Sequence, residues 1–381
     1  MMEKNLIGLT CISFCSYALT GALIIVTGII LGNVSEYFDV PITNMSNTFT
    51  FLNAGILISI FLNSWLINVI TLKKQLIAGF ILTITAIWIL IFHHTLTSFS
   101  IGIFMFGIVS GVTMSIGTFL ITHLYKENNR ASILLLTDSC FSMSGIIFPI
   151  IATYLLSNHI TWYWIYPLIS IFYLIIFVLT LNLKFPILNL QTIKNKKIEP
   201  WNMSIFYLSM SALLYILGQL SFISWIPEYV TKSINLNITQ AGRLVSNFWM
   251  SYMIGMWIFS FVLKYFNTKN IIIYLTGIST LLIYIFNNVY NYTLLRLIII
   301  LIGFFSSAIY TIIITLASQQ TKVPSPKVIN FILTSGTIGT LLTFIVTGPI
   351  VKNYGSISAL ITSNILYGLV CIISILLNIK K

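Results

Sequence analysis

The chain is a succession of twelve apolar runs, each close to the length that a membrane-crossing helix needs. A helix requires about 20 apolar residues to cross a hydrocarbon core of about 30 Å. The backbone in lipid must satisfy its own hydrogen bonds, and the runs lack strict alternation, so each is expected to be a helix. The runs cover residues 6–32, 46–70, 75–92, 97–123, 131–156, 163–183, 203–227, 241–263, 270–287, 294–317, 329–350 and 358–378.

Composition excludes a water-soluble protein. Hydrophobic residues make up 58% of the chain and charged residues 7%, whereas a soluble domain has about 25% charged residues. The net charge of +12 is spread over single or paired cations at the ends of the apolar runs. Because these cations form no continuous basic face, nucleic acid is not an expected partner. The expected partner is the lipid bilayer.

One long segment interrupts the hydrophobic pattern, and it divides the runs into six and six. This segment, KFPILNLQTIKNKKIEP at residues 184–200, carries four lysines. The predicted organisation is an N-terminal six-helix bundle over residues 1–183, a cytoplasmic linker over 184–200 and a C-terminal six-helix bundle over 201–381.

The two halves also share short patterns at corresponding places. The matches are Ser13-x3-Tyr17 with Ser211-x3-Tyr215, Glu36-Tyr37 with Glu228-Tyr229, and Gly107 and Ser110 with Gly303 and Ser306. Together they favour a duplication that yields two pseudo-symmetric bundles, the parallel repeat found in some secondary transporters.

Lysine and arginine predict the orientation, because short cytoplasmic loops are enriched in both residues. With both termini in the cytoplasm, fifteen of the nineteen cations lie on the cytoplasmic side. The opposite side keeps four, namely Lys232, Arg243, Arg296 and Lys352. Both termini are therefore expected to be cytoplasmic.

Asp138 is the only acidic residue in the interior of a predicted span. It follows Arg130 by eight residues, which places it roughly 12 Å inside the membrane at about 1.5 Å per residue. An ionised carboxylate at the bilayer centre costs about 2.5 to 3.5 kcal/mol, so the neutral acid is expected to be favoured. Asp138 is thus a candidate proton carrier beside the substrate. The alternative is a neutral acid that bonds a neighbouring helix.

Other polar side chains recur inside the spans and suit a neutral polyol, a sugar or an aromatic compound. Taken singly, each is more often an interhelical packing residue than a ligand contact. The candidates are Tyr17, Thr20, Asn47, Asn53, Ser110, Ser142, Tyr215, Gln219, Asn247, Tyr252, Tyr310 and Thr337. On the helix of Asp138, Gly145 and Pro149 permit close approach and bending, so they are gating candidates or packing residues.

Several classes of chemistry have no signature in this chain. The phosphate-binding loop motif G-x4-G-K-[ST] is absent from the sequence, so transport driven by ATP hydrolysis within this chain is not expected. The four histidines fall near helix ends and the four cysteines are expected to be small buried hydrophobes, so no metal or cofactor is predicted. A single intramembrane carboxylate does not make an enzyme, because it lacks a partner acid or nucleophile.

Six segments together resemble the bacterial TsgA proteins, members of the major facilitator superfamily near the fucose:proton symporters. They are SYALTGALIIVTGIILGN, MSNTFTFLNAGILISIFLN, SGVTMSIGTFL, LVSNFWMSYMIGMW, FFSSAIYT and SQQTKVPSP. The resemblance runs essentially end to end and implies an inner-membrane transporter with a central cavity and alternating access. The segment around Asp138 resembles the fucose symporter helix where a polar side chain meets sugar.

The chain departs from the usual family pattern at two gate elements. The loop after the second span, ordinarily G-x3-D-[RK]-x-G-[RK]-[RK], is here NVITLKKQ and keeps Lys73 and Lys74. The glycine-proline signature of the fifth span is reduced to Gly145 and Pro149. All four residues remain gating candidates.

The function expected from the sequence is proton-coupled symport of a small polar or amphipathic solute, in a bacterial inner membrane. An exporter or proton antiporter using the same acid is the alternative within transport. The alternative from another class is a membrane-embedded sensor or assembly protein without flux.

Overall fold

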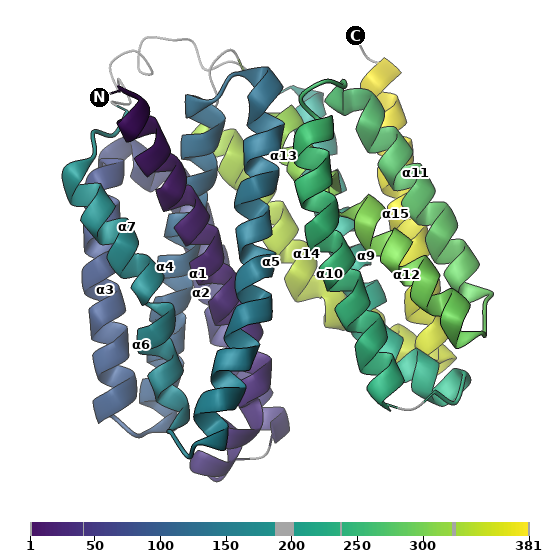
Figure 1. The fold of residues 1–381 in the computed structure, drawn as a ribbon, viewed down its shortest axis with the longest axis horizontal. Helices are drawn as coiled ribbons and strands as arrows, with labels where there is room; N and C mark the ends of the chain where they lie inside the picture. The colour runs from purple at the N-terminus through teal and green to yellow at the C-terminus, as the bar shows by residue number, and fades with distance from the viewer. Residues whose placement is uncertain (1, 41, 187–201, 237, 322–324, 380–381) are drawn as a thin grey trace. The chain divides into compact units, whose positions relative to one another are not determined.

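The computed structural model describes residues 2–40, 42–186, 202–236, 238–321 and 325–379. The linker lysines Lys194, Lys196 and Lys197 lie outside the described residues, as do the side chains of Asn47 and Pro149. In the described part, twelve helical stretches are long and apolar enough to cross a membrane. The predicted all-α membrane fold is confirmed (Figure 1).

The helices of the first half extend past the apolar runs at several ends, because polar residues outside the hydrocarbon continue the helical hydrogen bonding. The elements are α1 (Met2–Tyr37), α2 (Ile42–Val69), α3 (Leu72–Phe92), α4 (Leu96–Leu124), α5 (Glu127–Ser157), η1 (Trp162–Trp164), α6 (Ile165–Ile169) and α7 (Ile171–Asn182).

The helices of the second half behave in the same way. Helix α9 continues through Pro227, where the apolar run ends, and α14 continues through Pro349. The elements are α9 (Met203–Ser233), α10 (Ile238–Val262), α11 (Thr268–Asn287), α12 (Tyr292–Ser306), α13 (Ile309–Ser318), α14 (Pro326–Tyr354) and α15 (Ser356–Ile379).

The tenth predicted span is interrupted between α12 and α13, at Ser307 and Ala308. The hydroxyl of Ser307 donates to the carbonyl of Phe304 at 2.7 Å, while its backbone N–H reaches the same oxygen at 3.3 Å. A serine hydroxyl that competes for a helical carbonyl is a known cause of helix bending. The sixth span is likewise divided, into η1, α6 and α7.

By contacts, the chain divides into two compact units. The first holds the described parts of Met1–Leu124, Thr137–Pro200 and Ser325–Asn330. The second holds those of Tyr125–Leu136, Trp201–Pro324 and Phe331–Lys381. The start of α5 groups with the second unit and the start of α14 with the first, so each unit includes a short segment from the other half of the sequence.

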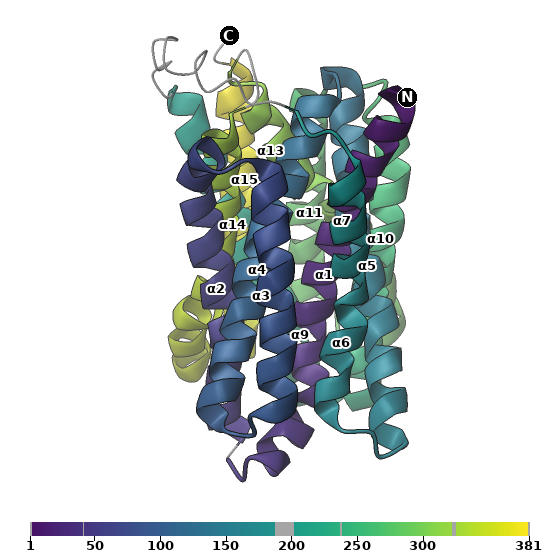
Figure 2. The ribbon, with the colours of Figure 1, turned by 90° about the vertical axis from the view of Figure 1, so that its left-hand side faces the viewer.

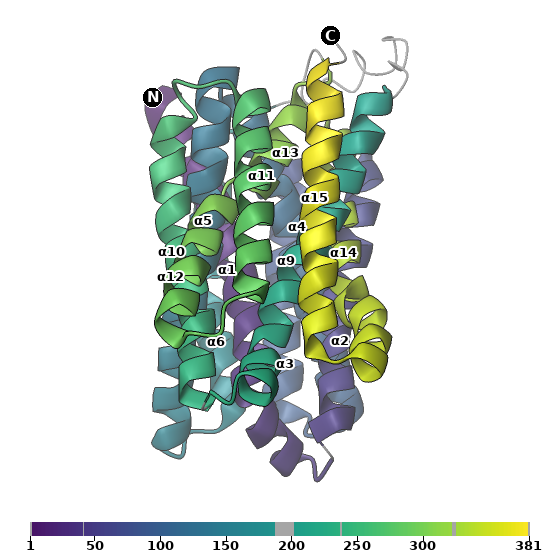
Figure 3. The same cartoon turned by 90° about the vertical axis from the view of Figure 1, so that its right-hand side faces the viewer.

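Equivalent helices pack in the same pairs within each unit. In the first unit α4 contacts α1, α2 and α3, and α7 contacts α1 and α3 (Figure 2). In the second unit α10 contacts α12, α13 contacts α9, and α15 contacts α9 and α11 (Figure 3). The repeated pairing agrees with the repeat inferred from the sequence.

Two glycines that the repeat places at equivalent positions allow close contacts in equivalent helix pairs. A Cβ atom on Gly107 of α4 would collide with the carbonyl oxygen of Leu52 on α2. A Cβ atom on Gly303 of α12 would lie 2.5 Å from the carbonyl oxygen of Phe248 on α10. Such close backbone approach is typical of helix packing in membranes.

Candidate functional site

Asp138 lies within α5 in the first unit, partly exposed. It is close enough to Tyr17 of α1 and to Cys140 to act on both electrostatically. Of the seven acidic residues in the chain, it is the one far from the end of any apolar run.

Close packing between α1 and α5 positions this carboxyl. Gly21 of α1 is so near α5 that a Cβ atom would collide with the carbonyl of Phe141 and lie 2.7 Å from Oγ of Ser144. One turn further, Gly145 contacts the Ile25 side chain. The glycine predicted for gating therefore also has a packing role.

Hydroxyl groups join α1 to α4 on the other side of α1. The Tyr17 hydroxyl lies 2.7 Å from Oγ1 of Thr118. Ser110 donates to Oγ1 of Thr20 at 3.1 Å, and Ser13 donates to the carbonyl of Gly117 at 3.0 Å. The side chains of Tyr17, Thr20 and Ser110 are all buried. These three candidates are thus hydrogen-bonded between helices, and direct contact of each with a solute stays a prediction.

The remaining candidates of the first unit are more scattered. Ser142 is buried on α5, four residues from Asp138, and Asn53 is partly exposed on α2. Lys73 donates from Nζ to the carbonyl of Leu181, the penultimate residue of α7, at 3.0 Å. The backbone N–H of Lys74 reaches the capping hydroxyl of Thr71 at 3.4 Å.

In the second unit, four tyrosines gather around Ser306. The Tyr215 hydroxyl donates to the Ser306 carbonyl at 2.7 Å and lies 3.5 Å from the Tyr252 hydroxyl. The Tyr367 hydroxyl donates to Oγ of Ser306 at 3.3 Å. The Tyr310 ring stacks on Tyr215, with centroids 6.5 Å apart. The arrangement brings the candidates Tyr215, Tyr252 and Tyr310 together, and it adds Tyr367, which the sequence analysis did not select.

Two amides of the second unit retain unused donors. Nε2 of Gln219 and Nδ2 of Asn247 are buried atoms without a hydrogen-bond partner among the described residues. A buried donor that stays unpaired costs about 1 to 3 kcal/mol, so such atoms are suited to a ligand oxygen. Thr337, by contrast, donates to the carbonyl of Leu333 within its own helix at 2.9 Å.

A buried polar chain that the sequence analysis did not select lies in the first unit. Nδ2 of Asn63 on α2 donates to Oγ of Ser115 on α4 at 2.7 Å. Ser115 donates in turn to Oδ1 of Asn330 at the start of α14. The signal in the sequence was an asparagine deep inside the apolar run at 46–70, since a polar group in lipid must find a partner.

Arg130, near the start of α5, is buried. In the second unit its Nη1 donates to Oγ of Ser318 at 2.9 Å. Ser318 is the last residue of α13, and the C-terminus of a helix attracts a cation. No three His, Cys, Asp or Glu side chains among the described residues are arranged to hold a metal ion.

The comparison with known proteins can be set beside this geometry. Residues 9–324 match the model of the Major Facilitator Superfamily. A "Protein TsgA homolog" of Buchnera aphidicola subsp. Baizongia pistaciae is 67% identical over 368 residues, which cover 97% of this chain and 95% of the relative. A TsgA homolog of Yersinia pseudotuberculosis serotype O:1b is 58% identical over 381 residues, with coverage of 99% and 97%.

Solved structures of major facilitator transporters share the fold. The E. coli fucose:proton symporter FucP superposes with a TM-score of 0.78 at 16% identity, covering 97% of each chain. The proton:xylose symporter XylE superposes with a TM-score of 0.76 at 11% identity, covering 97% of this chain and 95% of its own. At these identities the likeness establishes the fold alone.

Proposed function

Because this chain belongs to the Major Facilitator Superfamily and, within it, to the TsgA homologues, we propose that it couples proton entry to uptake of a small polar or amphipathic solute. A major facilitator transporter is a multi-pass membrane protein, and its twelve apolar helices fit that class. The coupling ion, the solute class and the direction of transport are the parts that we propose.

Asp138 is the observation that carries the proton coupling. It is the sole acid deep in an apolar run, it is partly exposed, and it lies near the buried Tyr17 hydroxyl. Ionisation at the centre of a bilayer costs about 2.5 to 3.5 kcal/mol, and less when water reaches the carboxyl. A conformational change that alters water access therefore alters proton affinity, which is the requirement for coupling transport to protons.

The class of solute is inferred from the polar and aromatic side chains of the second unit. Gln219 and Asn247 offer unused N–H donors, and Tyr252 and Tyr310 offer aromatic faces with hydroxyls. Amides and aromatic rings of this kind suit a neutral polyol, a sugar or an aromatic compound. FucP and XylE are titled as fucose:proton and proton:xylose symporters, which supports testing sugars first.

The orientation of the chain is inferred from its charge distribution, and its membrane from the organisms of its relatives. Fifteen cations on one side against four on the other support cytoplasmic termini. The TsgA homologues are from bacteria, so we place the protein in the bacterial inner membrane. Lys73, Lys74, Gly145 and Pro149 stay the proposed gate residues.

The proton-carrying role can be tested without a known solute. The infrared carbonyl band of a protonated carboxyl should grow as the purified protein is acidified and shrink as it is made alkaline. We expect this pH-dependent band to be absent in Asp138→Asn. It should be retained in Glu228→Gln, whose acid pairs with Lys232 at 2.7 Å near a helix end. An unchanged band in Asp138→Asn would remove the proposal.

Transport itself is tested in proteoliposomes with an imposed pH gradient and an internal pH dye, using L-fucose and D-xylose as probes. Symport predicts that an acidic exterior accelerates uptake and that the solute carries protons inward. Opposite proton movement would identify the antiporter alternative. Solute binding to the purified protein with no flux in vesicles would favour the sensor or assembly protein.

A further inference from the structure

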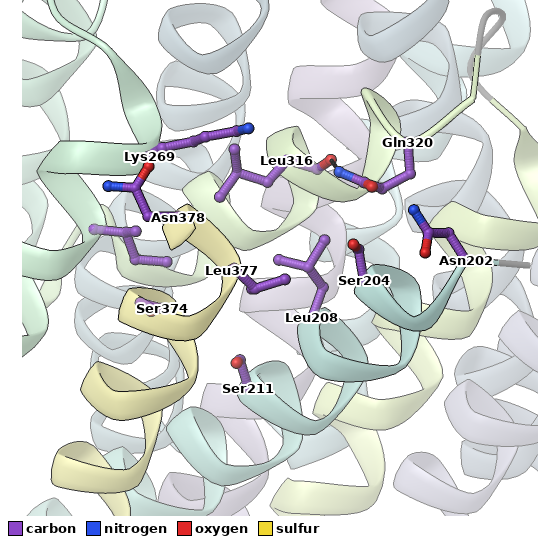
Figure 4. Close-up of a pocket in the computed structure, with 11 residues that line it drawn as sticks. Asn202, Ser204, Leu208, Ser211, Lys269, Leu316, Gln320, Ser374, Leu377 and Asn378 are labelled. Carbon is purple, nitrogen blue, oxygen red and sulfur yellow. Dashed lines mark hydrogen bonds between the residues drawn. The ribbon is translucent and has the colours of Figure 1, made fainter. Parts of the chain in front are cut away.

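The second unit contains a cavity of about 130 Å³ whose lining includes none of the residues proposed above for transport (Figure 4). It lies among α9, α11, α13 and α15, at the ends where α9 and α11 begin. Five of its lining residues carry the argument: Lys269, Leu208, Ile272, Leu316 and Ser211.

The rim of the cavity favours an anion. Lys269, in the first turn of α11, is exposed and extends across the rim in Figure 4. Among the described residues its Nζ has neither a hydrogen bond nor an ion pair, and no acid lines the cavity. Asn202 precedes α9 without capping it through its side chain, so the first N–H groups of that helix add positive potential.

Apolar and polar side chains both line the interior. Leu208, Ile272 and Leu316 are buried and form the apolar part of the wall, and the buried Ser374 also lines the cavity. Ser211 lies beyond them, 1% exposed, and its hydroxyl has no hydrogen-bond partner among the described residues. Figure 4 shows this hydroxyl directed toward the cavity. A buried hydroxyl without a partner costs about 1 to 3 kcal/mol, which a ligand could recover.

The unpaired hydroxyl of Ser211 is not a requirement of the fold. The repeat pattern matches Ser211 to Ser13, and Ser13 donates to the carbonyl of Gly117 at 3.0 Å. The Ser13 hydroxyl therefore bonds a neighbouring helix, whereas the Ser211 hydroxyl faces the cavity without a partner among the described residues. The difference between the repeats points to a ligand group at Ser211.

We propose that this cavity binds a small organic anion, with a carboxylate at Lys269, a short apolar middle against the leucine and isoleucine walls, and a hydroxyl at Ser211. Size supports this choice, because an apolar cavity of about 150 Å³ accommodates benzene, which limits the ligand to about six or seven heavy atoms.

Length supports the same class of ligand. The rim residue Ser204 and the floor residue Ser211 are seven residues apart on α9, about 10 Å along the helix. The depth from rim to floor is therefore of the same order as a chain of about four carbons with a polar group hydrogen-bonded at each end.

Binding to the purified, detergent-solubilised protein tests the proposal separately from transport. The probes are 4-hydroxybutyrate, butyrate and inorganic phosphate, titrated by calorimetry. We expect saturable binding of 4-hydroxybutyrate with a Kd on the order of millimolar, given so few atoms. Butyrate should bind about three- to tenfold more weakly, because it cannot pair with Ser211. Phosphate should bind more weakly still, because it leaves the apolar walls empty.

Three variants sharpen the test. Lys269→Gln should weaken the binding of both 4-hydroxybutyrate and butyrate by about tenfold. Lys264→Gln removes an equal charge from a lysine outside the cavity, near the Phe261 ring, and should leave binding unchanged. Ser211→Ala should make the two carboxylates bind equally while preserving the melting temperature of the ligand-free protein. Unchanged affinity in Lys269→Gln, phosphate binding as tight as 4-hydroxybutyrate, or no saturation of the wild type would overturn the proposal.

Discussion

Ser115 of α4 donates a hydrogen bond to Oδ1 of Asn330 on α14, and both side chains are buried at 1% exposure. Ser115 also accepts from Asn63, so one hydroxyl joins three helices. Asn330 is the last residue of α14 that groups with the first unit, and Phe331 begins the part that groups with the second. The bond therefore ties the start of α14 to α2 and α4 within the first unit.

Asn330→Ala should lower stability, because it removes the acceptor of Ser115. In membrane proteins a hydrogen bond between helices contributes about 0.6 to 1.7 kcal/mol. Thr343→Ala is the control on the same helix, since Thr343 bonds only the carbonyl of Gly339 at 3.1 Å. Thermal unfolding in detergent should show a larger decrease for Asn330→Ala. Equal decreases would mean that the bond contributes nothing beyond an intrahelical one.

Tyr17 and Thr118 should be energetically coupled through their 2.7 Å contact. A double-mutant cycle of Tyr17→Phe and Thr118→Val measures this coupling, which we expect at about 0.6 to 1.7 kcal/mol. As a control, the pair Tyr17→Phe and Thr276→Val should be additive, because Thr276 lies in α11 and bonds within that helix. Additivity in the first cycle would contradict the observed hydrogen bond.

Gly107→Ala should destabilise the protein, because its new methyl group would collide with the backbone of α2. Overpacking of this kind costs about 1 to 3 kcal/mol. The control is Gly348→Ala on α14, where a Cβ atom meets nothing within 4 Å. Alanine at that helical position should be neutral or stabilising by up to about 1 kcal/mol. Melting temperatures of the two variants should therefore move apart, and a shared decrease would contradict the close packing.

The orientation inferred from charge predicts which sites a membrane-impermeant thiol reagent can reach. In a background with the four native cysteines replaced, Lys232→Cys should be labelled in intact spheroplasts. Lys126→Cys should be labelled only in inverted vesicles. Both lysines are exposed at helix ends. The reverse pattern would place the termini outside the cytoplasm.

Hydropathy was sufficient to predict the twelve helices. The thickness of the hydrocarbon core sets the length of each span, and the absence of water there requires a helical backbone. It could not locate the break at Ser307 and Ala308, which depends on a local hydroxyl in competition for one carbonyl. The helix ends were also missed, since α9 continues past its predicted run to Ser233 and α14 continues past its run to Tyr354.

The residues of the candidate site were harder to predict from the sequence, for a geometric reason. A polar residue in a membrane span faces either a cavity or a neighbouring helix, and the amino-acid sequence alone does not distinguish the two. Tyr17, Thr20 and Ser110 prove to be hydrogen-bonded between α1 and α4. Asn330 lies two turns before the candidate Thr337 on the same helix, and only the folded structure brings it to Ser115.

Lys73 has a partner that cannot titrate, namely the main-chain oxygen of Leu181 near the end of α7. The usual loop of this family carries an aspartate, and this chain has none there. A hydrogen bond to a main-chain oxygen does not depend on the protonation of a carboxyl partner. The edge of the first unit formed by α3 and α7 should therefore stay rigid while acidification acts elsewhere.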